Sequence, residues 1–513
     1  MLKPRVFLIA MMTLIAGMTY THVYPCDVIV VSAKASTTGR PFIIKNRDCS
    51  ANWHQEIKHY PAAGTGIGGD YIIVSAFDDA AEFNNGDPIN PSGGVNEAGF
   101  AISCTSVYED FNPLHEIINI NTDLMKHALE DCATLADFEK LLKNFYKTHY
   151  GKVISGNFVA IDSKGGAALY ECFTGWIIAG AWPMDYRKYD ANTGRVTVFN
   201  GGLISYSYTE DEGDGEDFIG FHARANCNTY IPFNYGEERR ERMNYLLTGL
   251  AETGRLNYRN CMVEVAKDVY GQQLDGFGNV VDQEDCQDDY STTYCISRAA
   301  TRLSMLVDGV APGNDPRLSV FWCALGEPSV SVYIPYFVYA GGVSPLAWVD
   351  DIDLDGRWYD QNDTSLLARA ANARETFEGR LYEANTGDLV AGMDDKTMDK
   401  NELANIQSWT FPLEEYIFQR CEEFLADITE HPSYLTPDNL RNFSNYSAQY
   451  AYRNYLQADA NAYAWTYDKP WDDLWIGYTR GGFDNDYYDP IASGSTASSG
   501  DSLVDTLLAL FGL

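Results

Sequence analysis

Two short apolar runs near the start of the chain constrain the fold most strongly, because the residues between them favour a reversal. Residues 27–35 are almost continuously apolar and rich in β-branched side chains, and residues 42–44 repeat this composition. The intervening residues 36–40 read STTGR, which is typical of a turn. The sequence therefore predicts a β-hairpin.

Pairing across this hairpin decides which residues meet. If the turn is centred near residues 38–39, antiparallel pairing sets Cys26 opposite about residue 50. Residues 45–48 then return to the neighbourhood of Cys26. The start of the first strand is thereby expected to face the end of the second.

The chain that follows mixes strand and helix patterns. Apolar residues at helical spacing predict helices at about 121–147 and 236–250. Together with the hairpin, the pattern predicts an α+β fold with antiparallel strands. Further strands are predicted at residues 71–76, 100–107, 157–161, 167–171, 195–199, 319–325 and 329–334.

Composition divides the chain into four segments. The first begins with Lys3 and Arg5 and continues with an apolar run too short for the roughly 18 to 20 residues of a membrane span, which predicts a secretory signal. We therefore expect export, to a periplasm or to the outside, and no membrane span. The segments are a signal peptide with a short pro-segment (1–25), the main domain (26–348), a helical, Tyr- and Trp-rich C-terminal extension with helices near 365–383 and 413–428 (349–490), and a flexible tail (491–513).

Charge and cysteine content exclude several classes of protein. The 72 acidic and 37 basic residues give a net charge of −35, which makes nucleic acid a poor partner. Eleven cysteines in an exported chain leave at least one thiol unpaired, and we assign it to Cys26. Cys286 and Cys295 are the pair most readily bridged. The absence of CxxC spacing argues against zinc.

A cysteine at a mature N-terminus has a particular chemistry. Its own α-amine, with a usual pKa of about 7.7 to 8.0, can accept the thiol proton at neutral pH. The hairpin would bring Asp48 close enough to orient that amine, and Lys45 or Arg47 could lower the thiol pKa or hold a substrate carbonyl. Alternatively, Cys26 is buried or disulfide-bonded and residues 45–48 lie at the surface.

Four motifs in order carry a resemblance to a known superfamily. Cys26 at the start of a strand, ASTTG at 35–39, KNRD at 45–48 and GVNEAG at 94–99 resemble the cysteine N-terminal nucleophile (Ntn) hydrolases. That superfamily includes the choloylglycine (bile salt) hydrolases and penicillin V acylases, the acyl-CoA:6-aminopenicillanate acyltransferases and a family of dipeptidases. The resemblance covers roughly residues 26–345.

The resemblance implies a four-layer αββα sandwich of antiparallel sheets and an enzyme without a cofactor. Its Cys26 thiolate would attack a linear amide, form an acyl-enzyme and pass the acyl group to water. The substrate would be an N-acyl amino acid, a small peptide or a related acyl amide. A dipeptidase, or an acyltransferase that uses another amine in place of water, remains an alternative.

The resemblance also implies roles for individual residues. Asp48 would hold the amine of Cys26, and Lys45 stands where bile salt hydrolases have an arginine. Asn226 matches an active-site asparagine that orients the nucleophile or the substrate. Arg239 would support Asp48 or the charge of the site.

An oxyanion donor is harder to place. Asn96 lies in the GVNEAG motif, and counting forward from it as in the superfamily leads to Ser106, whose hydroxyl can donate. Asn96 can instead be a turn residue between two strands, because Asn beside Gly is common in turns.

Two further readings remain open. Asp351, Asp353 and Asp355 form the opening of a calcium loop, but Asn362 stands where a bidentate glutamate is expected, so a solvated acidic loop is the alternative; no other metal site is predicted. From a different functional class, the chain could be a secreted binding protein without catalysis. Cys26 would then be structural, and the aromatic C-terminal region would hold a glycan or peptide.

Overall fold

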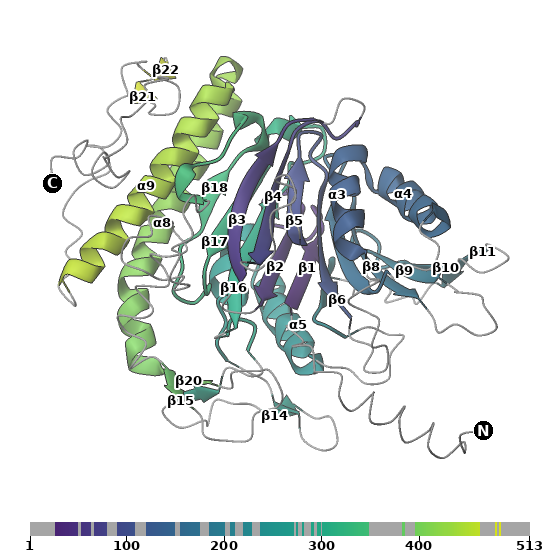
Figure 1. Ribbon diagram of the computed structural model, residues 1–513, viewed down its shortest axis with the longest axis horizontal. Coiled ribbons are helices and arrows are strands. Elements are labelled where there is room, and N and C mark those ends of the chain that lie inside the picture. Colours follow the sequence, from purple (N-terminus) through teal and green to yellow (C-terminus); the bar gives the residue numbers. More distant parts are fainter. Residues whose placement is uncertain are drawn as a thin grey trace, which may run out of the picture.

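The structure is a computed structural model of an α+β protein with two large antiparallel sheets and several helices (Figure 1). Among the described residues, no helix is long and apolar enough to cross a membrane. The expected signal peptide, calcium loop and tail, and Cys286, lie outside the described residues. These are 26–49, 53–62, 66–78, 90–107, 120–148, 154–174, 184–200, 206–210, 219–227, 236–270, 273–274, 280–281, 289–291, 295–298, 300–347, 382–384, 396–461, 478–479 and 482–483.

The predicted hairpin is confirmed and forms part of a six-stranded sheet. Its register differs from the prediction, because Cys26 pairs with Arg47. The connection spans residues 32–41, so its centre lies nearer the first strand than expected. The strand order is β12 (Phe221–Arg224), β1 (Cys26–Val31), β2 (Phe42–Asp48), β16 (Thr301–Asp308), β17 (Val320–Leu325) and β18 (Ile334–Tyr336).

A nine-stranded sheet lies against the first. Val28 and Ile44 of the six-stranded sheet share one buried apolar core with Val95 and Val159 of the nine-stranded sheet. Its neighbouring strands all pair antiparallel. The order is β11 (Tyr206–Glu210), β10 (Val196–Asn200), β9 (Met184–Asp190), β8 (Ala167–Thr174), β7 (Gly156–Ile161), β6 (Ala101–Ser106), β5 (Asn90–Asn96), β4 (Tyr71–Asp78) and β3 (Trp53–Tyr60).

Two helices cover the other face of this sheet. The sequence predicts a single helix over 121–147, but the structure has α3 (Asn121–Asp131) and α4 (Leu135–Thr148). Cys132 adopts an extended backbone (φ −118°, ψ 138°) that ends α3. Thr134 then starts α4, because its Oγ1 accepts a hydrogen bond from the backbone N–H of Asp137 (3.2 Å).

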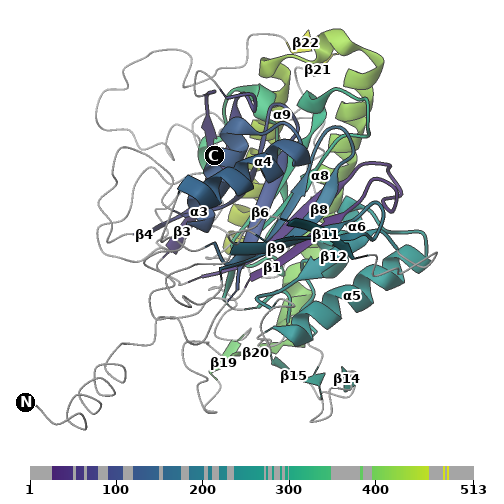
Figure 2. The same ribbon diagram turned by 90° about the vertical axis from the view of Figure 1, so that its right-hand side faces the viewer.

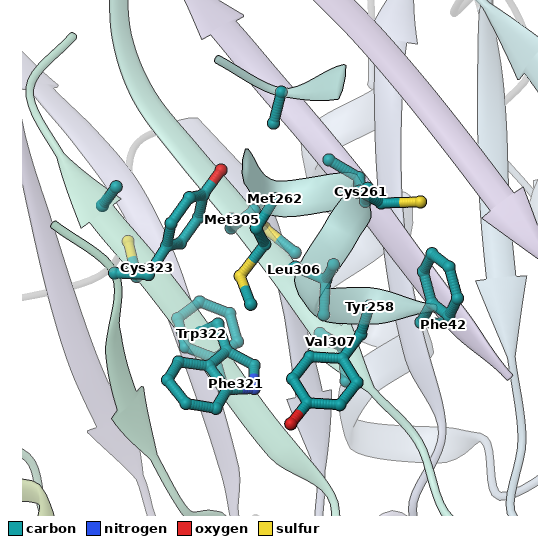
Figure 3. Close-up of a cluster of buried hydrophobic side chains, with 14 of the residues drawn as sticks. Phe42, Tyr258, Cys261, Met262, Met305, Leu306, Val307, Phe321, Trp322 and Cys323 are labelled. Atoms are coloured by element: carbon teal, nitrogen blue, oxygen red, sulfur yellow. The ribbon is translucent and has the colours of Figure 1, made fainter. Parts of the chain in front are cut away.

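The six-stranded sheet is covered by α5 (Glu237–Glu252), α6 (Tyr258–Asn260) with a π-helical turn η2 (Cys261–Val265), and two long helices. These are α8 (Lys400–Glu430), which contains the predicted helix 413–428, and α9 (Pro437–Asn461); Figure 2 shows them from the side. Figure 3 shows Tyr258 and Met262 packed beside Trp322 of β17. Phe418 of α8 meets the Trp322 ring edge-on, 5.1 Å between centroids, so the C-terminal helices share the main core.

Several strands differ from the prediction. The segment 329–334 is extended only at its end, where β18 begins. The pattern did not predict β3, β5, β9, β11, β12 or β16. The remaining short strands are β13 (Gln273–Leu274), β14 (Val280–Val281), β15 (Asp289–Ser291), β19 (Tyr382–Ala384), β20 (Lys396–Asp399), β21 (Tyr478–Thr479) and β22 (Gly482–Phe483).

Candidate active site

Cys26 is the first residue of β1 and carries a free, buried thiol that is 9% exposed. Paired residues of antiparallel strands point to the same face, so Cys26 shares its face with Arg47 of β2. Arg47 donates to Ser92 Oγ in the nine-stranded sheet. The thiol therefore lies on the inner face of the six-stranded sheet, between the two sheets.

The backbone nitrogen of Cys26 is held by one side chain. It donates to Asn226 Oδ1 at 2.7 Å, and Asn226 follows β12, the strand paired with β1. Asn226 Nδ2 donates to Thr105 Oγ1 (3.0 Å) and to the Ser106 carbonyl (2.7 Å). Thr105 Oγ1 in turn donates to the Cys26 carbonyl (3.3 Å). This ring fixes the Asn226 amide with its oxygen toward the Cys26 nitrogen.

Arg239 connects this ring to the carboxylates. It lies in the first turn of α5 and is 2% exposed. Its Nη2 donates to Asn226 Oδ1 (2.9 Å), and its Nη1 donates to Asp27 Oδ2 (3.2 Å). The same Nη1 lies 3.9 Å from Asp48 Oδ2. One guanidinium thus lies beside two carboxylates and polarises the acceptor of the Cys26 nitrogen.

The sequence predicts that Asp48 contacts the Cys26 nitrogen directly, but Asn226 and Arg239 lie between them. Its Oδ2 lies 2.7 Å from Arg298 Nε, and its Oδ1 accepts from Thr301 Oγ1 at 2.5 Å. The acceptor of the Cys26 nitrogen is Asn226, so Asp48 acts on that nitrogen through Arg239. The expected proximity of Asp48 and Arg239 is present, and Arg298 is a second cation on the same carboxylate.

Two more cations lie on the face that carries the thiol. Lys45 is 4% exposed and donates through Nζ to the Cys104 carbonyl in β6. Arg47, directly opposite Cys26, is 6% exposed. Burial raises the pKa of the neighbouring Cys104 and Cys49 thiols to about 11, against the attraction of these cations. Both neighbours therefore stay protonated at neutral pH.

The candidate oxyanion residues lie in different places. Asn96 forms the turn between β5 and β6, where its Oδ1 accepts from Phe100 N (3.0 Å). Its Nδ2 donates to the carbonyls of Leu129 (2.8 Å) and Cys132 (2.7 Å) at the end of α3. Asn96 thus ends β5, and these contacts support its interpretation as a turn residue. Ser106 reaches the site with its backbone carbonyl, through Asn226.

Sequence reasoning missed Asp27, Thr105, Arg298 and Thr301. Asp27 is the one charged residue in β1, and this interruption of the apolar run was the available signal. It points to the outer face, toward α5, with Asn46, whose Nδ2 donates to the Ala266 carbonyl (2.8 Å). Burial raises the pKa of Asp27 to about 6, which the nearby Arg239 opposes and Asp48 supports.

The described residues contain no group of three or more His, Cys, Asp or Glu side chains that could hold a metal ion. Comparisons of the sequence with protein-family models and with curated proteins gave no match.

Proposed function

We propose that the chain is a secreted amide hydrolase of the cysteine Ntn type, with Cys26 as its nucleophile. The observation that carries the proposal is the environment of the Cys26 nitrogen, which Asn226 Oδ1 holds at 2.7 Å beside the buried Arg239. Any buried backbone N–H needs an acceptor, and what distinguishes Cys26 is that its acceptor is a side-chain amide held by a buried arginine. The two stacked antiparallel sheets, with helices on both sides, support the four-layer αββα sandwich of that superfamily.

The mechanism requires cleavage of the bond between Pro25 and Cys26, which turns the held nitrogen into an α-amine. Asn226 would remain its acceptor, and the guanidinium of Arg239 would favour the neutral amine, because a second positive charge nearby disfavours an ammonium. The neutral amine then accepts the thiol proton, and the sulfur attacks the carbonyl carbon of a linear amide.

Collapse of the tetrahedral intermediate breaks the amide bond, and the amine of Cys26 returns its proton to the leaving nitrogen. Water attacks the thioester that remains, gives its proton to the same amine, and releases the acid with the thiol restored. Lys45 is the best placed side chain to stabilise the oxyanion. Its ammonium carries three donors, and among the described residues it has one hydrogen-bond acceptor, the Cys104 carbonyl.

The test uses the full chain secreted from a host with its own leader. Intact mass and N-terminal sequencing should show a protein that begins at Cys26. The processed protein should release free acid from a panel of N-acyl amino acids and dipeptides, and a slow substrate should add its acyl mass to the protein. C26S should lower hydrolysis by at least about 1,000-fold, because the nucleophile is lost.

The matched control is C132S, which alters a buried cysteine on the far side of the nine-stranded sheet and should keep activity. A fully processed protein that begins upstream of Cys26 and hydrolyses none of the panel would contradict the proposal. In that case a secreted binding protein becomes the better description. Transfer of the acyl group to an added amine in preference to water would identify an acyltransferase.

A further inference from the structure

Asp27 is a buried carboxylate next to the nucleophile, and its position is unusual for a strand residue. It is 2% exposed and lies on the outer face of β1, away from the thiol. Its carboxylate contacts Arg239 Nη1 at 3.2 Å through both oxygens. The other terminal nitrogen of that guanidinium, Nη2, donates to Asn226 Oδ1. Asp27, Arg239, Asn226 and the Cys26 nitrogen thus form an unbroken chain of contacts.

We propose that Asp27 is a positioning residue that sets the pH at which Cys26 becomes reactive. It does so in two ways: it orients Arg239 toward Asn226, and its negative charge offsets the cations around the nucleophile. The inference rests on the proposed function, because it assigns a regulation to the same site.

The balance of charge decides the direction of the effect. The charged groups that act on Asp27 are Arg239 on α5, Asp48 on β2, Arg298 before β16 and, from the opposite face of the sheet, Lys45 on β2. With both carboxylates ionised, these three cations exceed the anions by one. Protonation of Asp27, or its replacement by a neutral residue, raises this excess to two positive charges. The larger positive charge lowers the pKa of both the thiol and the amine of Cys26.

Through its own protonation, Asp27 therefore makes the reactivity of Cys26 depend on pH in the mildly acidic range. Burial raises its pKa to about 6, so it takes up a proton on the acid side of the usual amine pKa of about 7.7 to 8.0. The proton taken up by Asp27 makes the surroundings more positive and keeps the amine neutral to lower pH. The site would thereby retain its nucleophile at mildly acidic pH.

The test measures the rate at which iodoacetamide alkylates Cys26 as a function of pH, in the processed full-length protein, with the modified residue identified by mass spectrometry. D27N keeps an acceptor for Arg239 and removes the charge, and it should move the midpoint of alkylation to lower pH by about half a unit or more. The acid limb of kcat/KM should move in the same direction. D27A also removes the anchor of Arg239 and should lower kcat/KM by about tenfold or more, whereas D27N should retain most of the activity at its own optimum.

D308N is the matched control. Asp308 is also buried, also has a pKa raised to about 6, and is paired with Arg40 at the far end of the same sheet. It should leave the alkylation midpoint unchanged. A folded D27N protein with the wild-type midpoint would overturn the role of Asp27 even if the enzyme hydrolyses amides. A shifted midpoint in a protein that hydrolyses none would instead overturn the proposed function alone, because alkylation requires no substrate.

Discussion

Arg239 is the residue on which the candidate site depends most. It joins Asp27, Asn226 and Asp48, which come from three separate parts of the chain, and it is almost fully buried. A planar guanidinium can donate along two edges at once, which is the geometry required to reach a carboxylate and an amide oxygen together. A lysine in this position would supply the charge without the second contact.

Replacement of Arg239 should separate these two properties. R239K should retain the fold and lower kcat/KM at least about tenfold, because one ammonium cannot hold Asp27 and Asn226 together. R239M leaves two buried carboxylates with less compensation and should lower the free energy of unfolding by about 3 to 5 kcal/mol. Urea unfolding and steady-state kinetics measure the two effects.

The neighbouring Arg240 provides the control for this pair. It lies on the same helix and contacts Glu237 and Glu241 near the surface, so R240K and R240M should each change stability by less than about 1 kcal/mol. Wild-type kinetics for R239K would contradict the assigned geometry.

At the scale of elements, the sequence predicted the hairpin and six of the other strands wholly or in part, because their apolar runs are continuous. It missed β16, which lies in the centre of the six-stranded sheet between β2 and β17. The sequence of β16 (TRLSMLVD) places polar residues inside the run, and two of them, Thr301 and Ser304, are buried and hydrogen-bonded. Without β16, sequence reasoning could not place Thr301 beside Asp48.

The helical layer explains a second limit of sequence reasoning. The change in composition after residue 348 suggests a separate extension, but α8 and α9 bury their apolar faces on the same core as the sheets. A composition boundary records amino-acid usage, whereas a shared core depends on contacts between distant segments. Lys267 and Glu414, separated by 147 residues, form such a contact.

The Lys267–Glu414 ion pair should anchor α8. Both side chains are 1% exposed, Nζ and Oε1 lie 2.9 Å apart, and each partner also bonds to the backbone near β18, at Ser331 O and Tyr333 N. K267M or E414L alone should lower the free energy of unfolding by about 3 to 5 kcal/mol, because a buried polar partner is left uncompensated. A double variant, K267M with E414L, should recover most of that loss.

Chemical unfolding of the four proteins gives the coupling energy of the pair. The exposed pair Arg255–Glu264 is the control, and R255A should cost less than about 1 kcal/mol. Strictly additive losses in the double variant would contradict a direct coupling between the C-terminal helix and the main domain.

At the scale of the whole molecule, the chain combines a net charge of −35 with several acids and histidines whose pKa values are shifted by burial. Burial raises the pKa of Asp27, Asp268 and Asp308 from 3.8 to about 6. Burial and the adjacent Arg224 lower the pKa of His222 from 6.5 to about 3, and burial also lowers that of His59. The raised pKa values of the acids and the lowered pKa values of the histidines change stability with pH in opposite directions.

The signs follow from proton binding. Each of the three acids binds its proton more tightly in the folded chain, so its contribution is full below pH 3.8 and is lost as pH rises to about 6. His222 binds its proton more weakly when folded, so its contribution is full above pH 6.5 and is lost as pH falls toward 3. Between pH 4 and 6 these contributions oppose one another, and the three acids outweigh the histidines, so this set of groups should favour the folded chain more at pH 4 than at pH 6.

Two variants should change the pH dependence of the free energy of unfolding in opposite directions. D308N removes an acid whose pKa is raised in the folded chain. The variant should therefore lose about 2 kcal/mol of stability relative to the wild type as pH falls from 7 to 4. In H222Q, the opposing histidine is removed, so the variant should gain relative stability over the same interval. Urea unfolding at pH 4, 5, 6 and 7 measures both slopes. Parallel pH profiles for the wild type and both variants would show that Asp308 and His222 titrate alike in the folded and unfolded chains, which contradicts their buried positions.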